Sequence, residues 1–128
     1  MSTLAVATIK SASSAATVFQ NSSGTEKGQL AKAWVNFNGQ NTIAIRDSFN
    51  VSSITDLGTG KTRVTLASAM SDTNFVVTAN SAYSPTDALR SVGLYHTFTT
   101  TTFEILTRYG TDGARDDQLV CCMVLGNS

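Results

Sequence analysis

Apolar and polar residues alternate in two runs between Lys32 and Asp56, and the dipeptide Asn38-Gly39 separates these runs. The residues that share one face of the first run are Ala31, Ala33, Val35 and Phe37. Trp34 falls on the opposite face, because successive side chains of a strand point to opposite sides. Asn-Gly adopts positive φ at low cost and favours the tight turns that join antiparallel strands. The pattern predicts a β-hairpin that presents Trp34, Phe37 and Phe49.

The same alternation of strand and turn continues from residue 29 to the C-terminus. Turn-forming residues gather at 56–60, 71–74 and 110–113, and a longer loop that holds the one proline begins with Tyr83–Asp87. Further strand-like runs occupy residues 63–66, 75–77, 92–98, 102–109 and 118–125. Seven or eight short strands at this spacing predict an all-β fold, an antiparallel β-sandwich or barrel with few or no helices.

The last predicted strand, residues 119–125, is apolar on both faces. Such a strand lies either at the centre of the core or at a subunit contact. It contains Cys121 and Cys122, whose side chains should point to opposite faces and therefore cannot easily bond to each other. Two small buried side chains are expected in a reducing cytoplasm, with an inter-subunit disulfide or a metal role as the alternatives.

Residues 1–28 differ from the β domain predicted over residues 29–128. Leu4 and Val6 alternate, Val18 and Phe19 form a short apolar patch, and most other positions are Ala, Ser, Thr or Gly. A segment with so few apolar anchors cannot bury enough surface to stay ordered alone. We expect an N-terminal arm that is either flexible or ordered by partner chains.

The composition narrows the possible classes of protein. The chain has 128 residues, of which 41% are hydrophobic and only 14% are charged, and its formal net charge is zero. Without a basic field, sequence-independent binding to nucleic acid is not expected. No apolar run reaches the roughly 18 residues that a membrane span needs, and the first residues do not resemble a signal peptide. Ser and Thr together account for 34 positions, which predicts a neutral, hydroxyl-rich surface suited to a rigid assembly.

Motifs for chemistry are incomplete. Gly60-Lys61-Thr62 imitates the end of a phosphate-binding loop, but the earlier glycine of that motif is replaced by Thr55, so a turn is expected. His96 has no partner at a catalytic spacing, and no nucleophile elbow is present. Glu26 and Glu104 stand alone in the sequence, which gives no support to glycosidase chemistry. We therefore expect no catalytic residues, no enzyme activity and no cofactor.

Three carboxylates gather near Arg115, at Asp112, Asp116 and Asp117. Clustered carboxylates can bind calcium, yet this order lacks the alternating ligands of an EF-hand loop. A solvated turn that Arg115 partly neutralises is the preferred interpretation, so no metal site is predicted.

The aromatic residues Trp34, Tyr83, Tyr95 and Tyr109 allow two interpretations. They could form a platform for stacking sugars, because an aromatic ring combines an apolar face with a polar edge. Burial of Trp34 against a neighbouring subunit is the preferred alternative. Recognition usually lies on loops carried by a rigid scaffold, here residues 83–87 and 109–117. The candidate interaction surface is Trp34, Tyr83, Asp87, Tyr109 and Asp112.

The sequence of residues 32–56 resembles small structural proteins and fibre-tip domains of tailed bacteriophages, especially those of marine cyanobacteria. The residues that carry the resemblance are KAWVNFNG and, after a short gap, IRDSFNVSSITD. The resemblance weakens over Met1–Gly28. It implies a non-enzymatic virion protein, assembled in the bacterial cytoplasm as a homotrimer whose arm wraps neighbouring subunits.

Within that class, the resemblance favours a tail-fibre or host-attachment protein that contacts other virion proteins and a host surface glycan or protein. The alternatives are a capsid decoration protein and, behind it, a carbohydrate-binding module. Neither nucleic-acid binding nor membrane insertion is expected.

Overall fold

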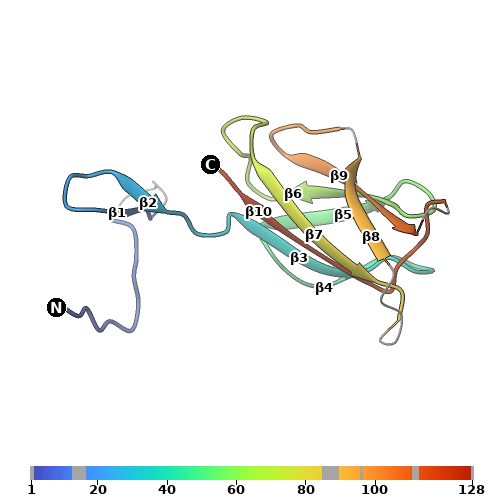
Figure 1. Ribbon diagram of the computed structural model, residues 1–128, viewed down its shortest axis with the longest axis horizontal. Coiled ribbons are helices and arrows are strands. Elements are labelled where there is room, and N and C mark those ends of the chain that lie inside the picture. Colours follow the sequence, from blue (N-terminus) through green and yellow to red (C-terminus); the bar gives the residue numbers. More distant parts are fainter. Residues whose placement is uncertain (1, 13–16, 85–89, 96, 111–112, 128) are drawn as a thin grey trace. The chain divides into compact units, whose positions relative to one another are not determined.

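A computed structural model describes residues 2–12, 17–84, 90–95, 97–110 and 113–127 (Figure 1). These residues form β-strands and contain no helix. The strands in chain order are β1 (Phe19–Gln20), β2 (Glu26–Gly28), β3 (Ala33–Asn38), β4 (Ala44–Phe49), β5 (Val51–Asp56), β6 (Lys61–Leu66), β7 (Val76–Ala82), β8 (Arg90–Tyr95), β9 (Thr102–Tyr109) and β10 (Leu119–Leu125). The expected all-β class is confirmed.

The chain divides into two compact units, Met1–Leu30 and Ala31–Ser128. The first unit contains the small antiparallel pair β1–β2. Its turn is organised by the side chain of Asn21, whose Oδ1 accepts hydrogen bonds from the backbone N–H groups of Ser23 and Thr25 at 3.1 and 2.9 Å. That partner chains order this unit stays a prediction.

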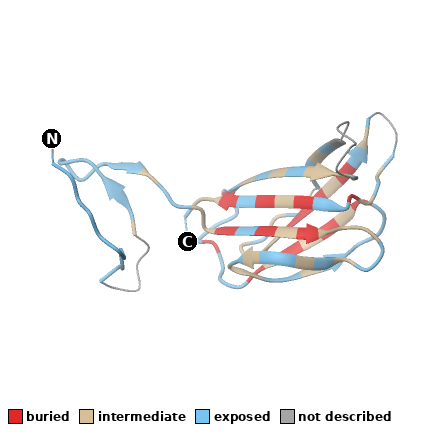
Figure 2. Ribbon diagram, turned by 90° about the horizontal axis from the view of Figure 1, so that it is seen from below, coloured by how far each residue is buried: buried red, intermediate tan, exposed pale blue. Residues whose placement is uncertain are grey.

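The second unit is a sandwich of two four-stranded antiparallel sheets, with strand orders β4-β3-β10-β7 and β5-β6-β9-β8. Buried residues recur at alternate positions along β3, β6 and β10, visible as red bands in Figure 2. This period of two is the one expected where each sheet turns one face toward a shared core. The predicted sandwich of seven or eight strands is therefore confirmed, with eight described strands in this unit.

Both sheets contribute to the core. Its largest fully buried apolar side chains are Phe37, Phe103, Ile105, Val35, Val64, Val120 and Val124. At the end of the sandwich where β6 stops and β9 begins, the ring of Phe75 lies 5.1 Å from that of Phe98 and 6.4 Å from that of Phe103, measured between centroids. Edge-to-face and tilted ring contacts of this kind close the core without polar atoms.

The sequence of β10, apolar on both faces, predicted either a central strand of the core or a strand at a subunit contact. β10 pairs with β3 on one side and with β7 on the other, so it is central in its sheet. Val120, Cys122 and Val124 are buried in the core, whereas Leu119 and Met123 on the outer face are exposed. The core covers one face of the strand, and the described part of the chain leaves the other open.

The hairpin predicted around Asn38-Gly39 is present, but the predicted turn is wrong. β3 and β4 pair in antiparallel fashion, and residues 39–43 connect them rather than a two-residue primed turn. Positive φ occurs at Asn41, at 56°, and not at Gly39. The Asn38 side chain instead bridges the loop, because its Nδ2 donates to the Gln40 carbonyl at 2.9 Å. Other predicted boundaries also differ: β6 begins at residue 61 instead of 63, β7 covers residues 76–82 instead of 75–77, and β8 covers residues 90–95 instead of 92–98.

A single residue, Asn50, carries the chain from one sheet to the other between β4 and β5. Its φ is 54°, in the left-handed region. Its Nδ2 donates to the Lys32 carbonyl at 2.9 Å, and its Oδ1 accepts from the Ser68 N–H at 2.8 Å. Asn tolerates this conformation better than most residues, and here the two bonds also join three separate segments.

We expect Asn50→Ala to lower the free energy of unfolding by about 2–4 kcal/mol, because alanine loses both hydrogen bonds and resists positive φ. Asn50→Gly should cost less, about 1–2 kcal/mol, because glycine accepts the backbone conformation. Denaturant unfolding of the two variants and the wild type measures the difference. Equal stability of Asn50→Ala and the wild type would show that the corner does not depend on this side chain.

Candidate functional site

One end of the sandwich is organised by the segment Arg115–Asp117, which lies between β9 and β10. The Arg115 N–H donates to the Thr107 carbonyl at 2.9 Å, and the Thr107 hydroxyl donates back to the Arg115 carbonyl. The Gly60 N–H donates to Asp116 Oδ1 at 2.6 Å, and the Gly39 N–H donates to the Asp117 carbonyl at 2.9 Å. The segment is thus fixed to the β5–β6 hairpin of one sheet and to the β3–β4 loop of the other.

Two glycines make this close approach possible. A Cβ atom on Gly60 would lie 2.6 Å from both the Arg115 nitrogen and the Thr107 carbonyl oxygen, and φ at Gly60 is 69°. A Cβ atom on Gly39 would lie 2.8 Å from the Asp117 carbonyl oxygen. The turn expected at Gly60-Lys61-Thr62 is present only at Gly60, whose missing side chain permits the backbone contact, while Lys61 and Thr62 begin strand β6.

The interpretation of the acidic loop as a solvated turn is wrong for Asp117. Its side chain is fully buried, whereas Asp116 is half-buried and holds the Gly60 N–H. The two neighbouring carboxylates therefore have different surroundings: Asp117 lies in the interior, and Asp116 lies partly at the surface with one oxygen bonded to the Gly60 N–H. Within the described ranges, no three His, Cys, Asp or Glu side chains lie close enough to hold a metal ion.

The Arg115 side chain brings together two aromatic residues that are remote in sequence. Its guanidinium carbon lies 5.2 Å from the ring centroid of Tyr83 and 5.6 Å from that of Tyr109. Both distances fall within the range of cation–π attraction. Two of the predicted candidate residues, Tyr83 and Tyr109, thus meet at one cation, while Asp87 and Asp112 lie outside the described residues, as does His96.

Beside this cation is an open depression of about 360 Å³, lined by Gln40, Asn41, Tyr83, Arg115 and Asp116. Gln40 joins two sides of this depression, because its Nε2 donates to the carbonyls of Tyr83 and Asp116 at 3.4 and 3.3 Å. Sequence reasoning named the two loops that contribute Tyr83 and Arg115 but missed Gln40 and Asn41. The only signal for them was the Asn-Gly turn, which marked a loop and not its position beside the others.

Trp34 lies elsewhere, on the outer face of the β4-β3-β10-β7 sheet. The cross-strand register aligns it with Phe49 on β4 and with Met123 on β10, and Met123 aligns with Thr78 on β7. Trp34, Phe49 and Met123 are 37%, 54% and 40% exposed. A second depression of about 340 Å³ on this face is lined by Trp34, Asn36, Thr78, Asn80, Cys121 and Met123, together with Val35 and Cys122. The predicted interaction surface is therefore divided between two places.

The two cysteines point to opposite faces of β10, as predicted. Cys122 is buried among core residues, but Cys121 lies half-buried on the outer face, so the expected burial of both side chains is correct for Cys122 alone; both are free thiols. Burial, and secondarily the neighbouring Cys121, raises the pKa of Cys122 to about 12. A thiol with so high a pKa stays protonated at neutral pH, and the thiolate is the reactive form.

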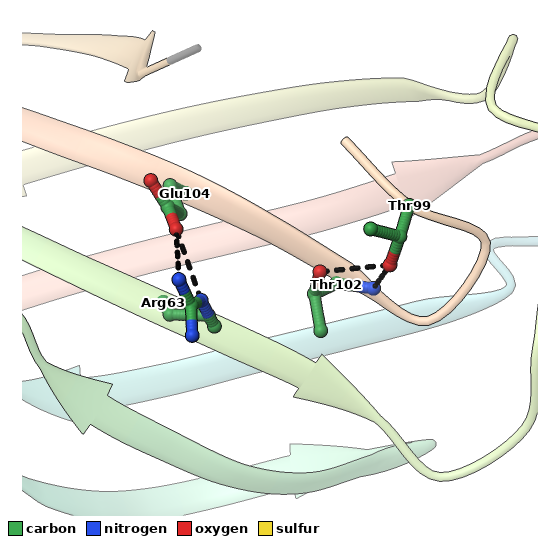
Figure 3. A network of polar contacts seen from close by, with 4 residues as sticks. All are labelled: Arg63, Thr99, Thr102 and Glu104. Atoms are coloured by element: carbon green, nitrogen blue, oxygen red, sulfur yellow. Dashed lines mark hydrogen bonds and ion pairs between the residues drawn. The ribbon is translucent and has the colours of Figure 1, made fainter. Parts of the chain in front are cut away.

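A buried carboxylate on the second sheet has a partner that the sequence did not reveal. Glu104 on β9 has no second carboxylate beside it in the sequence; it lies opposite Arg63 on β6, and its Oε1 accepts hydrogen bonds from Arg63 Nε and Nη2 at 2.9 and 2.6 Å (Figure 3). In the same view the Thr99 hydroxyl accepts from the Thr102 N–H at 3.0 Å and fixes the turn that begins β9. The role of Glu104 is therefore to hold two strands together.

The chain was compared with protein-family models, with curated proteins and with solved structures, and none of these comparisons found a match. Over the described part of the chain, no helix is long and apolar enough to cross a membrane.

We expect Gly39→Val to lower the free energy of unfolding by about 2–3 kcal/mol, because its Cβ would displace the Asp117 carbonyl and lengthen the hydrogen bond from residue 39. The matched control is Gly93→Val on β8, where a Cβ meets open space and valine favours the strand. The free energy of unfolding of Gly93→Val should therefore lie within about 0.5 kcal/mol of the wild-type value or above it. Equal effects of the two substitutions in denaturant unfolding would contradict the importance of this contact.

Proposed function

We propose that the protein is a non-enzymatic structural component of a tailed bacteriophage particle, of the tail-fibre or host-attachment kind, assembled as a homotrimer. The resemblance of residues 32–56 to phage fibre proteins supports the class. The structural observation that carries the proposal is the row of exposed apolar side chains on the outer face of the β4-β3-β10-β7 sheet: Trp34, Phe49, Val76, Leu119 and Met123.

The outward side chains of three strands in this sheet include no charged residue. They are Trp34, Asn36 and Asn38 on β3, Leu119, Cys121, Met123 and Leu125 on β10, and Val76, Thr78, Asn80 and Ala82 on β7. Soluble monomers seldom expose a contiguous apolar patch, and Trp and Met are enriched at protein interfaces. The face therefore has the character of a subunit contact, which also agrees with the preferred interpretation of Trp34.

The unit Met1–Leu30 also exposes apolar side chains. Those with large exposed fractions are Leu4, Val6, Ile9, Val18, Phe19 and Leu30. A short two-stranded pair supplies no core of its own for so many apolar residues. Contacts with neighbouring copies would cover them, which supports the assembled state.

The surroundings of the titratable groups support a role without chemistry. Asp116 holds the Gly60 N–H, Glu104 holds Arg63, and the Cys122 thiol is buried with a raised pKa. Each of these groups has a structural task, and catalytic groups instead need access to a substrate and a matched pKa.

We expect light scattering to give a mass of about 40 kDa, three times the 13.5 kDa of the chain, at micromolar concentration. Met123→Lys places a charge in the middle of the apolar face and should shift the mass toward one chain. Leu57→Lys is the matched control, because Leu57 is similarly exposed but lies in the β5–β6 turn. A wild-type mass of 13.5 kDa would contradict the trimer.

Particles produced without this chain should fail to adsorb to host cells and should keep their resistance to heat. A capsid decoration protein would give the reverse, with normal adsorption and earlier rupture on heating. Measuring adsorption and heat inactivation on the same particle preparation separates these two functions. Degradation of host envelope polysaccharide by the purified protein would contradict a non-enzymatic role.

A further inference from the structure

The polar depression at the loop end of the sandwich has the features of a ligand site. Three connections meet there: the β3–β4 loop supplies Gln40 and Asn41, the segment after β7 supplies Tyr83, and the β9–β10 connection supplies Arg115 and Asp116. We propose that this depression binds a carboxylated sugar residue of an acidic polysaccharide. The inference rests on the host-attachment function proposed above and adds the position of the site and the class of its ligand.

Arg115 supplies the positive charge. Among the described residues its guanidinium makes no ion pair or hydrogen bond, and it is held by the rings of Tyr83 and Tyr109 at 5.2 and 5.6 Å. By contrast, the guanidinium of Arg63 is already paired with Glu104. A guanidinium presents its N–H groups as a planar fork that matches the two oxygens of a carboxylate. The two rings restrict the side chain, so less conformational entropy is lost when the fork binds.

The remaining lining groups suit the hydroxyl groups of a sugar. Asp116 uses Oδ1 for the Gly60 N–H, and its second oxygen, Oδ2, makes no hydrogen bond or ion pair with the described residues. The Asn41 side chain offers an amide donor and acceptor, and its backbone is fixed in the left-handed region with φ 56°. Tyr83 is 37% exposed and offers part of its surface to an apolar sugar face. A carboxylate, hydroxyls and an apolar ring face are all present in a hexuronate.

Charge and size distinguish this ligand from the alternatives. Phosphate-rich polymers need several cations, whereas this site has one arginine in a chain with zero net charge, which suits a ligand with one carboxylate per sugar. A volume of about 360 Å³ lies at the lower end of the range for small-ligand sites and suits one or two sugar residues. The hydrogen bonds that fix Arg115–Asp117 hold the site in place before the ligand arrives.

The test is titration of the purified full-length protein with tetragalacturonate, followed by backbone amide chemical shifts. Binding in the millimolar range or tighter should move the resonances of Gln40, Asn41 and Asp116 and should weaken as salt is added. The fully methyl-esterified tetramer is the matched ligand, because it keeps the sugars and removes the charge. It should bind at least about tenfold more weakly, since a charge-assisted hydrogen bond contributes about 1.5–3 kcal/mol.

Two arginine variants complete the experiment. Arg115→Ala removes the fork but keeps the backbone bonds of the loop, and it should weaken tetragalacturonate binding about tenfold or more. Arg108→Ala makes the same change of charge at an exposed position on β9 outside the depression, and it should stay within about twofold of the wild type.

Three results would overturn the proposal: no shifts at these residues in about 10 mM tetragalacturonate, equal affinity for acid and ester, or equal losses in the two variants. The wild-type comparison of acid and ester needs no substitution, so it decides the matter even if a variant fails to fold. Because purified protein is used, a negative result leaves the adsorption phenotype of particles without this chain as a separate test of the attachment function.

Discussion

The contact between the segment Arg115–Asp117 and two glycines is the constraint on which one end of the molecule depends. Gly60 belongs to the β5–β6 hairpin and Gly39 to the β3–β4 loop, so a single stretch of backbone ties the two sheets together. Neither glycine leaves room for a Cβ, because the partners are backbone atoms that cannot rotate away. The Arg115 side chain and the carboxylate of Asp116 extend from that same stretch. The hydrogen bonds between this stretch and the two glycine-containing connections therefore also fix the positions of the groups that line the polar depression. This explains how exposed loops can present a fixed set of groups.

Much of the β-sandwich could be predicted, because residues close together in the sequence determine where each strand and turn forms. Alternation along residues 33–38 and 102–109 reflects the two faces of a sheet, and turn-forming residues mark where a strand must end. The error at Gly39 shows the boundary of this reasoning. An Asn-Gly pair is compatible with positive φ, yet the glycine is required here for closeness to the Asp117 carbonyl, and the left-handed residue is Asn41. Local preference identified a turn, whereas a contact with residues far along the chain decided its shape.

The candidate sites were predictable only in part, for the same reason. Tyr83 and Tyr109 were both chosen because they begin loops, but nothing in their spacing indicated that Arg115 would lie between them. Glu104 looked isolated because its partner, Arg63, becomes a neighbour only once β6 and β9 pair in a particular register. Asp117 looked solvated because it follows another aspartate in a Gly-containing loop, and only the packing of both sheets buries it. Register and sheet stacking are properties of the whole chain, so single-residue patterns do not contain them.

The two candidate surfaces differ in chemistry, and this difference separates their tasks. The outer face formed by β3, β10 and β7 carries no charged side chain and exposes Trp34, Leu119 and Met123, so its cover by another protein surface would gain free energy by excluding water. The loop end is polar, with one cation and several hydrogen-bonding groups. It therefore favours a polar ligand whose own groups can form the hydrogen bonds that water makes with the lining residues. If copies assemble as proposed, one assembly carries several loop ends, and repeated weak contacts with a polymeric ligand would add up to firm attachment.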